Sequence, residues 1–107
     1  MARGEYLGEF EQIVLLAVAR LGDDAYGMAI RREIEARTGR QVSIGAVYAT
    51  VDRLELKGLV RPRDAQSGGR ARRFFAVTPA GRRALETSRE IHARMWAGLR
   101  LRRAGRR

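Results

Sequence analysis

The chain has 107 residues, enough for one domain with a modest core, and 22 Lys and Arg side chains stand against 12 Asp and Glu. The formal net charge of +10 points to a polyanionic partner or an acidic membrane surface. Cysteine is absent, which excludes disulfides, zinc–thiolate sites and thiol nucleophiles. We find no secretory signal and no apolar run of about 20 residues, so we expect a cytoplasmic protein that does not enter a membrane.

The positive charge is concentrated in the second half of the sequence. Residues 1–60 hold 8 basic and 9 acidic side chains, whereas residues 61–107 hold 14 basic and 3 acidic ones. The single histidine, His92, has no second candidate metal ligand nearby in the sequence and is best interpreted as a surface residue. We therefore expect no metal, no cofactor and no enzymatic activity.

Helical spacing of apolar residues predicts a first helix over residues 9–21, EFEQIVLLAVARL. The apolar surface of this helix is wider than a single stripe. Two interpretations stay open: the helix is wholly buried in its own domain, or Leu16 and its neighbours also contact a second subunit.

The second predicted helix, YGMAIRREIEART, takes Asp23 or Asp24 as its N-cap and Gly39 as its stop. A third helix begins after Ser43, whose hydroxyl can accept hydrogen bonds from the free amides of the first turn, and it ends before Gly58. Two helices joined by a short turn and docked on a third form a helix-turn-helix.

Two short strands follow, over residues 59–63 and 72–77, and the linker DAQSGGRA between them contains a glycine pair typical of a turn. The outer part of this hairpin carries Arg61, Arg63, Arg70, Arg72 and Arg73. The predicted fold class is mainly α with a small β-hairpin. It is a winged helix-turn-helix over residues 1–78, followed by a long dimerisation helix and basic tail over residues 79–107.

The last predicted helix is capped by Thr78 and runs from Pro79 to about Arg103. Small and apolar residues recur along it at spacings of three and four: Ala84, Ser88, Ile91, Met95 and Leu99. This stripe either forms a seam with a second copy of the chain or packs on the chain's own core. Some 25 helical residues would span about 37 Å and overrun so small a domain. We therefore expect a homodimer with the interface residues Leu16, Ile91, Met95 and Leu99.

One side of the third helix is small and nearly free of acidic residues, and it carries Gly45, Ala46, Ala49, Thr50 and Arg53. A DNA major groove about 12 Å wide admits a helix whose outer side chains are short. Ala46 and Ala49 can approach thymine methyl groups there. Thr50 is expected to bond to a base or a phosphate, and Arg53 to reach a guanine edge or a phosphate. Ser43 and the first amides of the helix offer a site for one phosphate.

Two tyrosines and the hairpin arginines complete the predicted DNA site. Tyr26 and Tyr48 either donate hydrogen bonds to phosphates or pack in the core. Arg70 and Arg72 flank the turn at Gly69, and arginine suits a narrow, negative minor groove. The alternative for these arginines is a solvated run of charge.

The runs LGEFEQIVLLAV, AYGMAIRREIEARTG, VSIGAVYATVDRLELKGLV and GGRARRFFAVTPAG resemble, in this order, the PadR family of transcriptional regulators over residues 7–82. The resemblance implies a winged-helix DNA-binding domain and a homodimer joined through the C-terminal helix with help from the first helix. It also implies repression of promoters that a small molecule relieves. The recognition helix would run from Ser43 to Lys57, and the tip of the wing from Gly68 to Arg72. Phe74-Phe75 stands where the family commonly has two tyrosines.

The sequence thus predicts a sequence-specific regulator that binds double-stranded DNA, expected to act as a homodimeric repressor on an inverted-repeat operator. Two alternatives stay open: a winged-helix module that binds an acidic protein, and a non-specific nucleic-acid-binding protein. Trp96, together with Met95, either lines a pocket for a small-molecule effector between subunits or packs as an ordinary interface residue.

Overall fold

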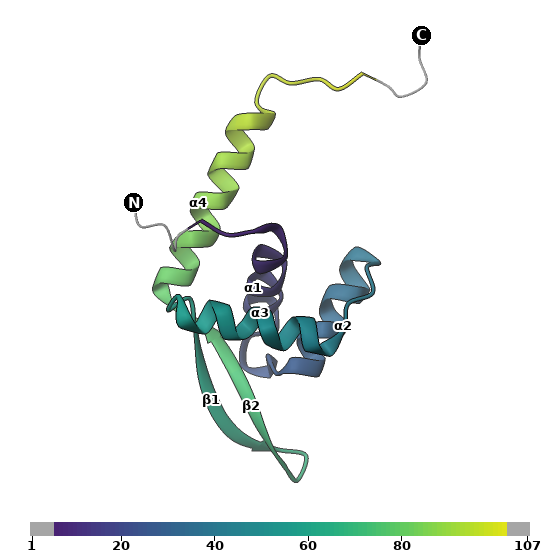
Figure 1. Cartoon of the computed structure of the whole chain (residues 1–107), viewed down its shortest axis with the longest axis vertical. Coiled ribbons are helices and arrows are strands. Elements are labelled where there is room, and N and C mark those ends of the chain that lie inside the picture. Colours follow the sequence, from purple (N-terminus) through teal and green to yellow (C-terminus); the bar gives the residue numbers. More distant parts are fainter. Residues whose placement is uncertain (1–5, 103–107) are drawn as a thin grey trace.

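The computed structural model describes residues 6–102 (Figure 1). Within this range the chain forms four α-helices, one short 3-10 helix and a two-stranded antiparallel hairpin. In chain order the elements are α1 (Glu9–Leu21), η2 (Gly22–Asp24), α2 (Gly27–Thr38), α3 (Ile44–Leu56), β1 (Val60–Ser67), β2 (Arg70–Val77) and α4 (Pro79–Trp96). A short turn joins α2 to α3, both pack on α1, and the hairpin lies beside α3. This arrangement confirms the predicted winged helix-turn-helix.

The core lies where α1, α2 and α3 meet. These helices supply apolar side chains that retain almost no exposed surface: Val14, Leu15, Val18, Ile30, Ile34, Val47, Val51 and Leu54. Phe75 from β2 and Ala84 from α4 belong to the same cluster. The hairpin and α4 are thus both anchored on the three-helix core.

The ends of α3 follow the local signals in the sequence. Ser43 Oγ accepts a hydrogen bond from the backbone amide of Ala46 at 3.0 Å, as expected of an N-cap. Beyond the other end, the backbone amide of Leu59 donates to the carbonyl of Leu54 at 2.9 Å, which closes the helix around Gly58 as predicted. Both ends of the proposed recognition helix are therefore fixed by its own residues.

The start of α2 differs from the prediction. Neither Asp23 nor Asp24 caps this helix, because both aspartates are used in η2 and the N-cap position falls on Tyr26. Ala25 lies between Asp24 and Tyr26, and its carbonyl accepts a hydrogen bond from the backbone amide of Phe75 at 2.8 Å. This bond ties the hairpin to the segment in front of α2.

The hairpin strands are longer than predicted, with eight residues in each. Pairing runs from Val60 opposite Val77 to Ser67 opposite Arg70. The turn residues Gly68 and Gly69 have φ values of 62° and 77°, and positive φ at both positions lets a two-residue turn match the twist of the strands. Pairing therefore continues through polar residues to the tip, which stands away from the helices (Figure 1).

The first half of α4 packs on the domain, and the second half leaves it. Ala84 and Ser88 are buried, whereas the last turns stand clear of the other helices (Figure 1). The helix ends at Trp96, well before the predicted end near Arg103. The chain leaves the helical conformation at Ala97, with φ of −58° and ψ of 127°, and Gly98 follows with a φ of 73°. A hydrogen bond from the amide of Leu99 to the carbonyl of Trp96 closes this β-turn. Leu99 therefore lies beyond the helix and does not continue its stripe.

The 18 residues of α4 span about 27 Å at 1.5 Å per residue, less than the length expected from the sequence. Met95 is 75% exposed and Trp96 is 58% exposed near its end. The expected basic tail lies mostly outside the described residues. No helix within residues 6–102 has the length and apolar character needed to cross a membrane.

Candidate nucleic-acid interface

The side of α3 that faces away from the core carries mostly small side chains. Gly45, Ala46 and Ala49 are exposed there, and Ser43 is exposed at the start of the helix. Asp52 is exposed on the next turn, so this side also carries an acidic residue toward its far end. Over its first turns, α3 can approach another macromolecule with its backbone.

Thr50 lies on the inner side of α3, which corrects the expectation that its hydroxyl meets a base or a phosphate. The residue is 1% exposed: it lies at the edge of the buried side of the helix, three positions after Val47 and four before Leu54, and α1 packs against that side. Its Oγ1 accepts a hydrogen bond from Nη2 of Arg53 at 3.1 Å. Thr50 thus acts on the Arg53 side chain inside the protein.

Arg53 is held from two directions while 55% of its side-chain surface stays exposed. Besides the bond to Thr50, its Nε lies 3.6 Å from Oε2 of Glu11, a residue in the first turn of α1. Glu11 also accepts hydrogen bonds from Lys57 Nζ, at 3.0 Å to each carboxylate oxygen, and from the backbone amide of Gly8 at 3.0 Å. This cluster joins the start of α1 to the last turn of α3.

The ionisation of Glu11 reflects the balance of these contacts. Burial raises the pKa of its carboxyl, but hydrogen bonds from Gly8 and Lys57 and the charges of Lys57 and Arg53 outweigh burial, and the pKa falls below its ordinary value. Glu11 is therefore a charged partner for both basic side chains at neutral pH.

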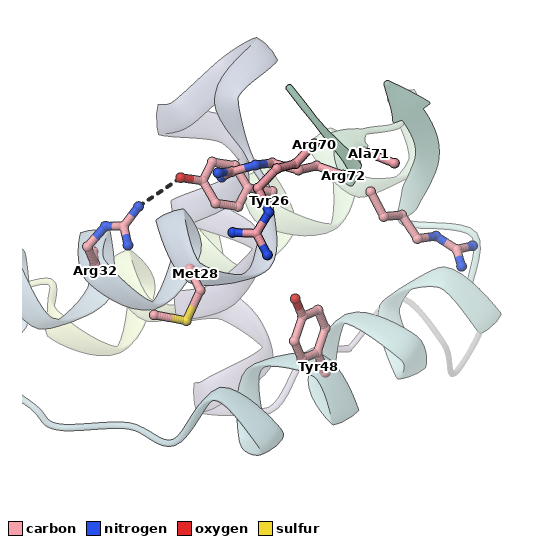
Figure 2. Close-up of a pocket in the computed structure, with 8 residues that line it drawn as sticks. Tyr26, Met28, Arg32, Tyr48, Arg70, Ala71 and Arg72 are labelled. Atoms are coloured by element: carbon pink, nitrogen blue, oxygen red, sulfur yellow. Dashed lines mark hydrogen bonds between the residues drawn. The ribbon is translucent and has the colours of Figure 1, made fainter. Parts of the chain in front are cut away.

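A cleft of about 510 Å³ opens between α2, α3 and β2 (Figure 2). It is lined by Tyr26, Met28, Arg32, Tyr48, Arg70, Ala71, Arg72 and Arg73. Four of these eight residues are arginines, and none of the lining residues in the described part of the chain is acidic. Figure 2 shows Tyr48 pointing into the cleft from α3, across from Tyr26 and Arg72. The cleft is thus suited to negatively charged groups.

Tyr26 is held between two arginines and a phenylalanine. Arg32 Nη2 donates to the Tyr26 hydroxyl at 2.8 Å, and the guanidinium carbon of Arg72 lies 4.2 Å from the centre of its ring. Phe74 packs against the same ring edge to face, with the ring centres 5.6 Å apart. The neighbouring guanidinium groups, Arg72 first and then Arg32, lower the pKa of the Tyr26 phenol. Tyr26 is therefore not a core residue: it packs on the hairpin and lines the cleft, where a phosphate contact stays a prediction.

Tyr48 lies against the start of α2 and is not a core residue, since 45% of its surface is exposed. Its ring and hydroxyl occupy the space where a Cβ atom at Gly27 would stand. Glycine at position 27 is thus what allows this close approach.

The hairpin residues named from the sequence differ in how they are held. Gly69 and Arg70 form the exposed tip, as expected. Arg72 is half-buried over the Tyr26 ring and does not project freely beside the tip. Arg63 donates from Nη2 to the backbone carbonyl of Asp23 at 3.2 Å. The arginines of the hairpin are therefore not a uniform run of solvated charge.

The residues predicted to contact a second subunit lie on α1, on α4 and beyond α4. Leu16 is exposed on α1, Ile91 is half-buried, and Met95 and Leu99 are exposed. A second cleft of about 450 Å³ lies between α1 and α4 and is lined by Gln12, Leu16, Leu85, Glu86, Ser88, Arg89 and His92. Trp96 is not part of this lining. The arrangement within one chain therefore does not test the expected effector pocket at Trp96.

Sequence analysis missed the residues that hold Tyr26 and Arg53 in place. These residues are Arg32, which bonds to Tyr26, and Glu11, which pairs with Arg53 and Lys57. Arg32 lies six residues after Tyr26 and Glu11 lies on another helix, so the periodicity of apolar residues does not indicate these pairs. The available signal was local: a glutamate at the third position of the first helix, where a capping box places it. Helical spacing indicates on which side of a helix a residue lies, but it does not identify the residue of another element that its side chain contacts.

A model of the transcriptional regulator PadR-like family matches residues 15–87 of the chain. The "Transcriptional regulator Rv3488" of Mycobacterium tuberculosis is 40% identical over 67 residues, which cover 63% of this chain and 62% of that protein. An "Uncharacterized 37.1 kDa protein in transposon TN4556" of Streptomyces fradiae is 41% identical over 83 residues, 78% of this chain and 22% of that protein. The chain spans less than two thirds of the length of each of these curated relatives.

Solved structures share the fold. A PadR family transcription regulator from Clostridium difficile has a TM-score of 0.68 at 24% identity, over 80% of this chain and 88% of that one. F93 from STIV, a winged-helix DNA-binding protein, has a TM-score of 0.66 at 20% identity, over 89% of this chain and 99% of its own. RosR of H. salinarum, in the complex termed S1, has a TM-score of 0.69 at 28% identity, over 92% of this chain and 83% of that one. With a family match that extends from α1 into α4, the chain belongs to the PadR-like family of transcriptional regulators.

Proposed function

We propose that the chain binds double-stranded DNA sequence-specifically, with α3 in the major groove and the tip of the β1–β2 hairpin in the minor groove. One observation carries the proposal: the small exposed side of α3 lies next to the arginine-lined cleft, and Tyr48 belongs to both. A duplex that meets α3 with its base edges would bring phosphates toward the cleft arginines.

The proposed contacts fall into two groups, because base contacts specify a sequence and phosphate contacts position the protein. The contacts to base edges come from the exposed side of α3: Gly45, Ala46, Ala49 and Arg53. The contacts to the backbone and the minor groove come from the start of α3, the cleft and the hairpin tip: Ser43, Tyr26, Tyr48, Gly69, Arg70 and Arg72. The exposure of Arg70 and the absence of acidic lining in the described cleft support the second group.

We further propose that the protein is a homodimer that represses transcription from an inverted-repeat operator. The exposed apolar side chains of Met95 and Trp96 near the end of α4, together with Leu16 on α1, support a contact between subunits. Residues 1–78 would then bind DNA and residues 79–107 would join the subunits. A small molecule bound beside Trp96 at that contact would be the effector.

The test begins with selection and sequencing of the genome fragments that the protein binds. The enriched duplex is then titrated against a random duplex at several salt concentrations. We expect an inverted repeat whose half-sites lie roughly 34–36 Å apart, or a multiple of that distance. The logarithm of the affinity should fall by about 0.9 per log unit of salt for each phosphate neutralised.

The same titration separates the alternatives. Equal affinity for the enriched and the random duplex would contradict sequence-specific binding and indicate a protein that coats nucleic acid. Salt-insensitive or undetectable binding to both duplexes would indicate a module that binds another protein.

A further inference from the structure

Arg53 is the basic side chain on the exposed side of α3, beside the small residues Ala46 and Ala49. We infer that Glu11 and Thr50 are positioning residues for Arg53, and that discrimination between DNA sequences depends on them although neither contacts DNA. The inference rests on the proposed function of α3. It gives Thr50, which is buried, an indirect effect on recognition, and it makes recognition depend on Glu11, a buried residue of α1.

The geometry around Arg53 supports this assignment. Thr50 Oγ1 accepts from Nη2 at 3.1 Å, and the Glu11 carboxylate lies 3.6 Å from Nε. These contacts engage two different nitrogens of one planar group. The hydrogen bond to Thr50 and the ion pair with Glu11 therefore favour one direction of the side chain and one orientation of its plane. An arginine reads guanine through two parallel donors, so the orientation of this plane decides whether both bonds form.

Lys57 explains why Glu11 can orient Arg53 without removing it from the surface. Both carboxylate oxygens of Glu11 accept from Lys57 Nζ at 3.0 Å, which is closer than the 3.6 Å contact with Arg53. The stronger partner of Glu11 is thus Lys57, and Arg53 keeps 55% of its side-chain surface exposed. A half-exposed guanidinium with preset orientation is suited to a specific contact.

The readout must separate orientation from charge. Removing the Glu11 carboxylate adds net positive charge, and this change favours every duplex through its phosphates. The ratio of the affinities for the enriched duplex and the random duplex cancels that contribution. A change in this ratio reports on the contact that distinguishes sequences.

The experiment measures this affinity ratio for Glu11→Gln and Thr50→Val, each alone and combined with Arg53→Ala. We expect Arg53→Ala to lower the ratio about tenfold, as for the loss of a bidentate base contact. Glu11→Gln and Thr50→Val should each lower it about three- to tenfold, and neither should lower it further once Arg53 is alanine. Both replacements nearly keep the side-chain shape, and thermal unfolding verifies that each variant is folded.

Glu33→Gln is the matched control. Glu33 is also a glutamate paired with two basic residues, Arg20 at 3.4 Å and Arg37 at 2.6 Å, but it lies on α2 and does not line the cleft. This replacement removes the same charge and should leave the affinity ratio unchanged.

Three results would overturn the inference. The first is a wild-type ratio in both Glu11→Gln and Thr50→Val while Arg53→Ala lowers it, which would leave the proposed function intact. The second is a drop of equal size with and without Arg53, which would show a general structural effect. The third is an unchanged ratio in Arg53→Ala, which would remove Arg53 from recognition. A wild-type protein that does not discriminate between duplexes would instead contradict the proposed function itself.

Discussion

At the level of single residues, the cleft shows two kinds of arginine. Arg72 lies over the Tyr26 ring and is half-buried, whereas Arg70 is exposed at the hairpin tip. The first side chain is part of the packing between α2 and the hairpin, and the second is available only to solvent or a ligand. Their replacement should therefore have different consequences for stability and similar consequences for binding.

Arg70→Ala is expected to weaken the enriched and random duplexes by similar factors and to flatten the salt dependence by about one unit. Arg72→Ala should do the same and also lower the free energy of unfolding by about 0.5–1 kcal/mol, because its contact with the Tyr26 ring is lost. Titrations at several salt concentrations, together with denaturant unfolding, check both statements. A selective loss for the enriched duplex in Arg70→Ala would contradict a phosphate contact.

Glu11 gives a prediction about pH. Glu11→Gln should lower the free energy of unfolding at neutral pH by about 1–3 kcal/mol, because charged hydrogen bonds to Lys57 are weakened. The pKa of Glu11 is lower in the folded chain, so the unfolded chain takes up the proton first as the pH falls. The advantage of the wild-type protein is therefore lost as the pH drops through the ordinary pKa of a glutamate carboxyl toward the lower pKa of the folded chain. Denaturant unfolding at a series of pH values should show the free energies of unfolding of the two proteins converging in acid. A difference that stays constant with pH would show that the charge of Glu11 is not the cause of the stabilisation.

The burial of Thr50 could not be predicted from the sequence. Its position on α3 lies between the exposed alanines and the buried valines, so helical periodicity permits either environment. The docking of α3 on α1 decides between them, and that docking depends on residues such as Glu11 that are distant in the sequence. The core positions Val47 and Leu54 were predictable because they lie at the centre of the apolar side.

At the level of elements, local signals predicted α1 and α3 well and the ends of the hairpin and α4 poorly. The Ser43 cap and the glycine stops fix helix boundaries within a few residues of the chain. The length of a strand depends instead on its partner, so the polar outer half of the hairpin carries no sequence signal of pairing. A β-turn through Ala97 and Gly98 ends α4 inside an apparently continuous stripe, because the positive φ that glycine allows at position 98 favours a turn over the periodicity of its neighbours.

The contact between α2 and α3 gives a prediction for Gly27. In Gly27→Ala the new methyl group would overlap the Tyr48 ring, which is half-exposed and can turn away. We therefore expect Gly27→Ala to remain folded and to weaken DNA binding by about the same factor as Tyr48→Ala. The double variant should bind no more weakly than either single variant, because both changes remove the same side chain from the cleft.

Equilibrium titration and thermal unfolding of the three variants check this prediction. Gly45→Ala is not a suitable control, since it lies on the proposed recognition surface. Gly22 is also unsuitable because of its positive φ, so Ala29→Ser on α2 serves as the conservative reference. Additive losses from Gly27→Ala and Tyr48→Ala would contradict a shared cause.

At the level of the whole molecule, α4 carries the proposed contact between subunits. Replacing Ile91 and Met95 together by Asp should convert a dimer into a monomer, because burying an unpaired charge in an apolar contact costs on the order of several kcal/mol per ion. The control is Ala93→Asp, which adds an exposed carboxylate on the side of α4 opposite Ile91 and Met95. Sedimentation at micromolar concentration distinguishes the states. A wild-type protein that sediments as a monomer would contradict the proposed dimer.

The central claim for the whole molecule is that α3 is the element that recognises DNA, and Ala49→Glu tests it most directly. This change places a carboxylate on the exposed side of α3, outside the core, so the fold should survive. Ala36→Glu, an exposed alanine on α2 outside the cleft lining, is the matched control. The measurement is the affinity of both folded variants for the enriched duplex. We expect Ala49→Glu to abolish specific binding and Ala36→Glu to retain it, whereas wild-type affinity in folded Ala49→Glu would show that α3 does not recognise the operator.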